Sequence, residues 1–318
     1  MKTTDVVAKL NAAVKAITRA DVASGLLTVE KSNRFIRVVE ESTPILKAAR
    51  RLPMNSHTRD IDRIAFSQRV LRGQKENEEI TNEAKPNTYL NKLESKEVGG
   101  YVSITDHTLE DNIEKKNFEN TVLDLMGGQV GRDLSYLLIQ GDTDLTGDPL
   151  LKEVDGWIKK AGNVLTASGT ETDDFNPTKP AEMFSAMLDA LPKKYLQNRS
   201  QWRYYVGWDI DEDYRQYIED TRPTSLGDTV LTGSNNLAYR GIPVEVSPEL
   251  PAGQAMLVLP SNMVYGLYRD IRVEPERLPK LRRTDFVVTL RTDCNYEDEN
   301  AVVVAEGYSG YVRGSGAA

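Results

Sequence analysis

The stretch that decides the fold is Leu237–Gly307, LAYRGIPVEVSPELPAGQAMLVLPSNMVYGLYRDIRVEPERLPKLRRTDFVVTLRTDCNYEDENAVVVAEG. Short runs rich in β-branched and aromatic residues alternate in it with proline and glycine turns, which is typical of strands joined by short connections. Its last part, TDFVVTLRTD followed by NAVVVAEG, predicts a closing β-hairpin. The stretch holds no group of residues with catalytic spacing, so it favours a structural role.

The composition is that of a water-soluble globular protein. The chain has 318 residues, enough for one large core or two modest ones, and 39% of them are apolar and 28% charged. No apolar run approaches the ~20 residues that cross a bilayer, so no membrane partner is expected. The first residues, MKTTDVVAKL, lack the apolar segment of a secretory signal.

The cysteine and histidine content argues against a metal centre and against catalysis. Cys294 is the single cysteine, which excludes an internal disulfide framework and a multi-cysteine zinc site and favours a reducing compartment. We expect it to be a buried, inert thiol. His57 has no nucleophile or orienting acid beside it, and His107 has the pattern of a neutral surface residue. The sequence therefore predicts no catalytic residue, no cofactor and no metal.

The net charge of −8 is unevenly distributed. Residues 1–72 hold 14 Lys and Arg against 7 Asp and Glu, a balance of +7, whereas the remainder holds 26 against 41, a balance of −15. A basic amino-terminal quarter on an acidic body indicates a partner of opposite sign, either nucleic acid or the acidic body of a neighbouring copy. A solvated helix face explains the same pattern equally well.

Residues 60–104 predict a long β-hairpin. Two runs in which apolar residues are separated by charged and polar ones flank an almost entirely polar segment near Gly73–Pro86, which is expected to form the tip. A two-stranded excursion of this kind has no core of its own and is marginal alone in water. We therefore expect it to lie on something else, most simply another subunit.

Residues 107–140 predict the longest helix. The apolar stripe begins after a candidate N-cap at Thr105 or Asp106 and stops at Gly141. Unbroken, such a helix would span roughly 50 Å at ~1.5 Å per residue. Three interior glycines favour a bend within it: Gly127, Gly128 and Gly131.

Shorter helices and strands fill the rest of the chain. Amphipathic helices are expected over residues 6–17 and 28–41, and a further helix over Asn176–Asn198. Arg203–Trp208 predicts a buried strand, and Asp209–Asp220 a short helix opened by acidic residues. Helices and strands mix without a regular βαβ alternation, so the expected fold class is α+β.

In order and spacing these elements resemble the major capsid proteins of tailed double-stranded DNA phages, which have the Hong Kong 97-type fold. The segment ITDHTLEDNIEKKNFENTVLDLMGGQVGRDLSYLLIQGD resembles the long spine helix of that family, and Asp155-Gly156-Trp157 the entry to its axial domain. RSQWRYYVGW and Tyr239–Val244 are similar to strands of that domain. The resemblance covers residues 30–307 and rests on order, spacing and length, since no single motif is specific.

The resemblance implies a division of the chain into six parts. They are the N-terminal arm (1–58), the extended loop with flanking peripheral-domain strands (59–104), the peripheral domain with the spine helix (105–155), the axial domain (156–270), the return to the peripheral domain (271–310) and a disordered tail (311–318).

The resemblance also implies a structural function. Copies would form hexamers and pentamers of an icosahedral shell that encloses double-stranded DNA in the virion, assembled in the bacterial host cytoplasm. A portal protein is an expected partner, and so is a separate scaffolding protein, because the chain has no room for a fused one. The alternatives are an encapsulin-type compartment shell that encloses cargo enzymes and, more remotely, a soluble α+β enzyme.

Six basic residues are candidates for inter-subunit or DNA-facing contacts: Arg50, Arg51, Arg277, Lys280, Arg282 and Arg283. Contacts with DNA would be directed to phosphates and independent of base sequence. A solvated basic loop is the simpler alternative.

Two further patterns suggest chemistry without establishing it. Asp142–Glu153 matches the spacing of an EF-hand calcium loop, but Thr146 and Pro149 depart from that pattern, so an acidic turn is the simpler interpretation. Some capsids of the family carry a covalent bond between a loop lysine and an asparagine of a neighbour. The expected loop holds four lysines (Lys75, Lys85, Lys92 and Lys96), yet no matching partner can be assigned.

Overall fold

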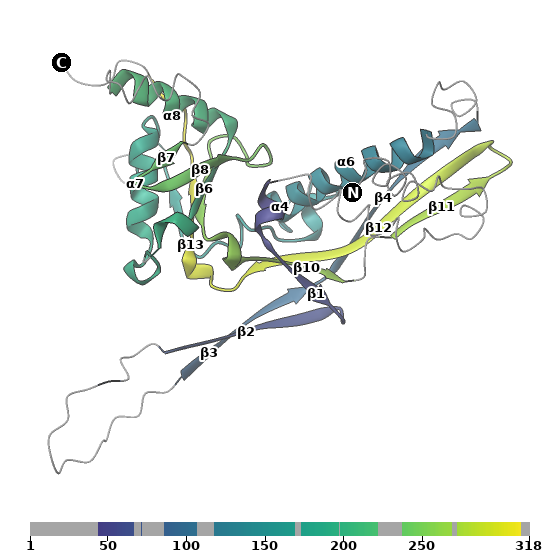
Figure 1. Cartoon of the computed structure of the whole chain (residues 1–318), viewed down its shortest axis with the longest axis horizontal. Helices are drawn as coiled ribbons and strands as arrows, with labels where there is room; N and C mark the ends of the chain where they lie inside the picture. The colour runs from purple at the N-terminus through teal and green to yellow at the C-terminus, as the bar shows by residue number, and fades with distance from the viewer. Residues whose placement is uncertain are drawn as a thin grey trace, which may run out of the picture.

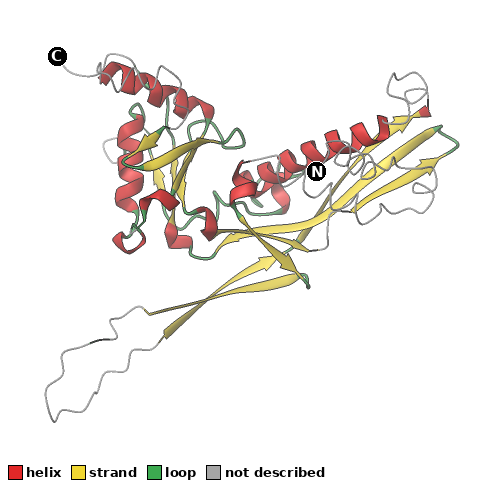
Figure 2. Ribbon diagram, in the orientation of Figure 1, coloured by secondary structure: helices red, strands yellow, loops and turns green. Residues whose placement is uncertain are grey.

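The computed structural model describes residues 44–66, 71, 86–106, 118–168, 173–196, 198–221, 237–268 and 272–312. It contains a five-stranded sheet, a six-stranded sheet and a separate two-stranded hairpin that extends away from both (Figures 1 and 2). This combination with helices confirms the α+β class. The helices expected over residues 6–17 and 28–41, and the tip of the hairpin, lie outside the described residues.

The five-stranded sheet, hereafter the peripheral sheet, is organised around the long strand β12. One edge of β12 pairs with β10 and then with β11, and its other edge pairs with β4, all antiparallel. β1 extends the sheet by pairing with β10 in parallel. The strands are β1 (Arg50–Met54), β4 (Lys96–Thr105), β10 (Met263–Tyr268), β11 (Arg272–Leu278) and β12 (Arg283–Tyr296).

Helix α6 (Phe118–Gln140) packs along this sheet (Figure 1). Its apolar residues, among them Leu134 and Leu138, share one core with Phe286 and Val288 of β12. The helix ends before Gly141, as predicted, and the first residues of the expected helix, 107–117, lie outside the described residues. α6 runs as one helix through its three glycines, which therefore do not break it, and a bend within it stays a prediction.

The six-stranded sheet, hereafter the axial sheet, has the order β5-β13-β9-β6-β8-β7. Its strands are β5 (Val164–Thr166), β6 (Arg203–Val206), β7 (Ala238–Tyr239), β8 (Ile242–Val246), β9 (Ala255–Val258) and β13 (Val302–Glu306). Helices α7 (Pro180–Ala190) and α8 (Trp208–Thr221) pack against it and against each other (Figure 1). A core that includes Phe184, Tyr204 and Leu257 joins the helices to the sheet.

Short helical turns link these elements. They are α4 (Pro44–Ala48) and the 3₁₀ turns η2 (Leu151–Glu153), η3 (Lys193–Tyr195), η4 (Arg199–Gln201), η5 (Pro260–Asn262) and η6 (Glu299–Ala301). Among the described residues, no helix combines the length and apolar character needed to span a membrane.

The protruding hairpin consists of β2 (Thr58–Phe66) and β3 (Pro86–Glu94), which pair antiparallel from Thr58 opposite Glu94 to Phe66 opposite Pro86. This confirms that the sequence forms a hairpin here, but the expected range 60–104 is too long, because residues 96–105 form β4 of the peripheral sheet. The preceding segment differs from a free arm, because Ile45 and Leu46 are buried in the core of the peripheral sheet and β1 is one of its strands.

The expected closing hairpin over residues 285–307 is wrong. β12 belongs to the peripheral sheet and β13 to the axial sheet, and the turn η6 separates them. Both strands are largely buried, so their apolar patterns alone could not show that they part. β10 likewise lies in the peripheral sheet, although the range 156–270 was expected to be axial throughout.

Three element boundaries also differ from expectation. The strand over Arg203–Trp208 ends at Val206, and Trp208 instead begins α8. α7 ends at Ala190 rather than Asn198, because Pro192 follows and cannot continue the helix. Tyr311, expected in a disordered tail, is bound to α8 through its backbone N–H, which donates to Asp213 Oδ2 at 2.9 Å.

Candidate assembly surfaces

The base of the protruding hairpin is anchored by a small core of its own. Ile61 of β2 and Leu93 of β3 are buried against Met54 and Val264 of the peripheral sheet. Gly266 permits this close approach, because a Cβ at that position would lie 2.4 Å from Met54 Sδ. The hairpin thus leaves the body from a packed base.

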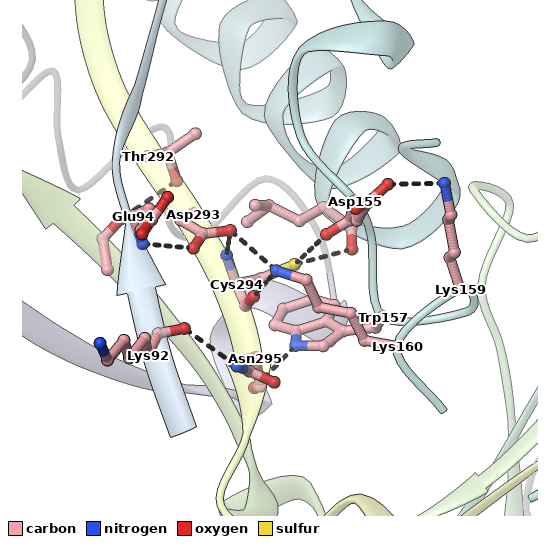
Figure 3. Close-up of polar contacts among 12 residues, drawn as sticks. Lys92, Glu94, Asp155, Trp157, Lys159, Lys160, Thr292, Asp293, Cys294 and Asn295 are labelled. Atoms are coloured by element: carbon pink, nitrogen blue, oxygen red, sulfur yellow. Dashed lines mark hydrogen bonds and ion pairs between the residues drawn. The ribbon is translucent and has the colours of Figure 1, made fainter. Parts of the chain in front are cut away.

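Side chains then attach β3 to the end of β12 (Figure 3). The backbone N–H of Glu94 donates to Asp293 Oδ2 at 2.6 Å, and Asn295 Nδ2 donates to the Lys92 carbonyl at 3.0 Å. Asn91 Nδ2 donates to the Tyr296 carbonyl at 2.8 Å. These bonds replace a backbone ladder between β3 and β12, so they fix where the hairpin points relative to the peripheral sheet.

A partly buried ion pair lies next to these bonds. Lys160 Nζ lies 3.0 Å from Asp293 Oδ1 and donates to the Cys294 carbonyl at 2.7 Å (Figure 3). Burial raises the pKa of Asp293, and the Lys160 ammonium opposes that shift. Cys294 is fully buried, as predicted, and burial raises the pKa of its thiol far above the ordinary value. A thiol in this state is a poor nucleophile.

A second group of polar contacts joins the hairpin to the axial sheet. Asp298, in the connection between β12 and β13, accepts a hydrogen bond from the Tyr195 hydroxyl and pairs with Arg63 of β2 at 2.5 Å, both at Oδ2. Burial alone would raise the pKa of Asp298, but the bonds from Tyr195 and Arg63 outweigh it and hold the pKa below its ordinary value. We call these three residues the Asp298 latch.

Beyond its base the hairpin exposes large apolar side chains. Ile64 exposes 70% of its surface and Leu90 49%. Asp62 pairs directly with Leu90, so Ile64, two residues further along β2, lies on the same face of the hairpin as Leu90. Tyr89 projects from the opposite face, with the Arg63 guanidinium 5.3 Å from its ring centre. The hairpin thus carries apolar surface that the described part of the chain leaves exposed.

The six predicted basic residues do not form one patch. Arg50, on β1, pairs with Glu297 at 2.6 Å. Arg277 and Arg283 lie elsewhere, at the end of the peripheral sheet where β11 meets β12. There Arg277 binds Asp106 through two bonds of 2.5 and 2.6 Å, and Arg283 lies 3.1 Å from Asp285.

The remaining basic candidates differ in exposure. Lys280 and Arg282 are exposed in the turn between β11 and β12, and among the described residues neither has an acidic partner. Arg51 is half-buried on β1. Lys280 and Arg282 are therefore the candidates with charge available to a partner.

The acidic loop after α6 is neutralised from within the chain. Lys159 Nζ pairs with Asp142 and lies 2.8 Å from Asp144 Oδ2 and 2.9 Å from Asp155 Oδ1. An ammonium group thus occupies the place that a cation would take. In the described part of the chain, no group of three or more His, Cys, Asp or Glu side chains could hold a metal ion.

Of the two histidines and the four loop lysines, the structure describes His57, Lys92 and Lys96. His57 Nδ1 lies 3.0 Å from Ser95 Oγ, a contact that ties the start of β2 to the end of β3. His107, Lys75 and Lys85 lie outside the described residues.

Sequence reasoning missed the residues that join distant parts of the chain. Arg63 and Asp298 are separated by 235 positions, and nothing in either local sequence indicates their contact. Trp208 was assigned to a buried strand, but its side chain is 70% exposed at the start of α8. The signal that could have corrected this assignment is the run of acidic residues that begins at Asp209.

A long helix on a sheet, a second sheet of mixed topology and a protruding hairpin with uncovered apolar faces define a shell-forming protein of the Hong Kong 97 type. Comparison with known proteins agrees. The putative prophage capsid protein YqbE of Bacillus subtilis (strain 168) is 30% identical over 295 residues, which cover 88% of this chain and 92% of that protein. The chain belongs to the family of phage capsid proteins.

Solved structures confirm the fold. A chain of the satellite phage P4 procapsid superposes with a TM-score of 0.63 at 16% identity, covering 88% of this chain and all of that one. A chain of the cyanophage A-1(L) capsid superposes with a TM-score of 0.63 at 13% identity, covering 84% of this chain and 92% of that one. A chain from the capsid of a native GTA particle superposes with a TM-score of 0.61 at 13% identity, covering 85% of this chain and 91% of that one. No protein-family model matches the chain. The comparisons favour a phage capsid protein over the encapsulin alternative.

Proposed function

We propose that this chain is the major capsid protein of a tailed phage and that its copies assemble as hexamers and pentamers into a closed shell around double-stranded DNA. The observation that carries the proposal is the hairpin β2–β3, which is anchored at its base and apolar beyond it. A two-stranded hairpin is marginal alone in water, and exposed apolar surface of this kind marks a site that another molecule covers. A neighbouring copy of the chain is the occupant that shell assembly supplies.

The proposal extends to partners outside the shell. A portal protein would take part in assembly in the bacterial host cytoplasm, and a separate scaffolding protein would set the size of shells that copies of the chain also form alone. The role of the chain would be purely structural, without catalysis. Lys280 and Arg282 would contact DNA phosphates or the acidic body of a neighbour. The exposure of both residues and their lack of an acidic partner in the described chain support this role.

The test combines the unmodified chain with a hairpin variant. The purified chain should form shells that electron microscopy resolves into rings of six and five, and Ile64→Lys combined with Leu90→Lys should abolish them. The unassembled variant should retain its stability to within about 0.5 kcal/mol, because both side chains are exposed in the single chain.

Asp62→Asn provides the matched control, since Asp62 lies on the same face of the hairpin and is exposed. It should assemble normally. A chain that stays monomeric at every salt concentration would contradict the proposed function. If the double-lysine variant assembles normally, the apolar face of the hairpin is not needed for assembly and no longer supports the proposed function.

A further inference from the structure

The axial sheet presents two chemically different surfaces at opposite ends of strand β6. η4 immediately precedes β6, and α8 begins two residues after it. The strand has four residues, roughly 13 Å at ~3.3 Å each, so the two ends are well separated. In Figure 1 α8 lies at the upper end of the axial sheet, and β13, which is parallel to β6 through β9, begins at the lower end.

The upper surface combines an uncovered indole with acidic side chains. Trp208, Glu212 and Glu219 of α8 are all exposed, and their spacing of four and seven residues places them on one face of the helix. Arg215 lies on the same stripe but is paired with the buried Asp211 at 2.8 Å, so it does not cancel the two glutamates. We call Trp208, Glu212 and Glu219 the α8 face.

An exposed tryptophan is unusual on a surface that faces only water. The other two tryptophans of the chain, Trp157 and Trp202, are buried, with 0% and 2% of their surface exposed. Tryptophan dominates the energy of many protein interfaces, and its ring attracts cations. The α8 face therefore suits a basic partner.

The lower surface is basic. Lys193 and Lys194 of η3, Arg199 of η4 and Arg240 of the β7–β8 turn are exposed, and we call them the basic end. The Arg199 guanidinium donates to the Arg240 carbonyl at 3.4 Å, which places η4 beside that turn. Tyr195, adjacent to Lys194, binds Asp298 just before β13.

Two acidic residues close in sequence or contact to the basic end are already engaged. Glu245 pairs with Arg203 at 2.8 Å, and Asp298 pairs with Arg63. Among the described residues, the four cations of the basic end have no carboxylate partner. Their charge is therefore available to another molecule.

We propose that the α8 face of one copy docks on the basic end of the next copy, with Trp208 at the centre of the contact. The two surfaces are opposite in charge and lie at opposite ends of one domain, so the contact is head-to-tail. Contacts of this kind repeat around a ring until it closes. The inference rests on the proposed function, and it names the side chains that join neighbours within a ring.

Charge reversal tests the contact. Glu212→Lys with Glu219→Lys, or Lys193→Glu with Lys194→Glu, should each slow assembly by about tenfold at low salt and less at high salt. Combining all four substitutions exchanges the two charges and restores the net charge, so it should recover most of the lost rate. Thermal melting of each unassembled variant checks that it is folded.

Tryptophan fluorescence provides a second test on the unmodified chain. A neutral quencher such as acrylamide should reach mainly Trp208 in the unassembled chain, because Trp157 and Trp202 are buried. Trp208→Phe should remove that quenchable fraction and confirm its source. On assembly the same fraction should become protected.

The outcomes separate the two proposals. If the unmodified chain forms no shells, the proposed function fails and the ring contact fails with it. If shells form but both reversals assemble normally, or the fourfold exchange gives no recovery, or Trp208 stays equally quenchable in closed particles, only the ring contact is overturned.

Discussion

At the scale of single residues, the close approach of Gly141 and Gly156 determines how the chain leaves α6. The Gly156 N–H donates to the Gly141 carbonyl at 2.7 Å, and a Cβ on Gly156 would lie 2.6 Å from the Ile139 carbonyl. The next residue, Trp157, is buried and donates from its ring to the Asn295 carbonyl at 3.2 Å. Because Gly141 and Gly156 have no side chains, the end of α6, the Trp157 indole and β12 can all meet at one point.

Gly156→Ala should lower the free energy of unfolding by about 2–4 kcal/mol, because the added methyl group meets backbone atoms that cannot move independently. Urea unfolding of the unassembled chain, with and without the substitution, measures this change in the free energy of unfolding. Gly128→Ala is the matched control: nothing lies within 4 Å of its Cβ position, so replacing an interior helical glycine should stabilise by up to about 1 kcal/mol. Equal effects at the two glycines would show that the backbone crossing is not tightly packed.

At the scale of elements, the loop between α6 and η2 shows how a sequence pattern can match a metal site without forming one. The Thr143 N–H and hydroxyl both donate to Asp155 Oδ1, and Asp142 Oδ1 accepts from the Asp144 N–H. Hydrogen bonds to Asp142 and Asp144, and then to Asp155, raise the pKa of Lys159, which therefore keeps its proton. The carboxylates are already satisfied by the chain itself.

Calcium should therefore not bind this loop. Titration with millimolar calcium is expected to give no heat of binding in calorimetry and no change in melting temperature. Adding a chelator to the purified chain should likewise leave its melting temperature unchanged. Heat of binding that disappears in Asp142→Asn would show instead that Lys159 yields its place to the metal.

The strand β12 is the element that unites the molecule. It pairs with β4, β10 and β11, receives α6 on one face and bonds through its side chains to β3 of the hairpin. Its apolar residues Phe286, Val288 and Leu290 alternate, which correctly predicts one buried face. The alternation does not identify the neighbours of the strand, because any antiparallel partner of suitable length satisfies the same pattern.

At the scale of the whole molecule, the Asp298 latch connects the hairpin, the axial sheet and the connection between the two sheets. Its carboxylate also accepts from the Asn300 N–H at 3.2 Å, which starts η6. The orientation of the hairpin relative to the axial sheet therefore depends in part on one charged group.

The latch predicts a loss of stability in acid. The pKa of Asp298 is lowered in the folded chain from the ordinary value of 3.8, so its contribution is present above that value and disappears as the pH falls below it. Asp298→Asn should cost about 1–3 kcal/mol at neutral pH, in line with hydrogen bonds to a charged group. Its unfolding free energy should fall less steeply than that of the unmodified chain below pH 3.8.

Denaturant unfolding across that pH range measures the difference between the two proteins. Lys179→Gln is a suitable control, because Lys179 forms an exposed pair with Glu182 away from the latch. It should change stability by less than about 0.5 kcal/mol at any pH. Parallel pH profiles for Asp298→Asn and the unmodified chain would exclude the latch as a source of the acid sensitivity.

Local patterns along the chain were enough to predict the class of the molecule and most of its elements. Apolar residues separated by polar ones predicted the hairpin β2–β3, the apolar stripe identified α6 with its end at Gly141, and the order of the pieces indicated the capsid fold. These features follow from local rules: side-chain alternation, helical periodicity, and glycine or proline at element ends.

Which strands share a sheet, and which side chains meet, could be seen only in the folded chain. β12 and β13 look like one hairpin in sequence but enter different sheets, and Arg63 reaches Asp298 across 235 positions. The division of the basic candidates into paired and unpaired ones, and the exposure of Trp208, were also visible only in the fold. The physical reason is that pairing and burial depend on neighbours distant in sequence, whereas sequence patterns record only what each segment tolerates.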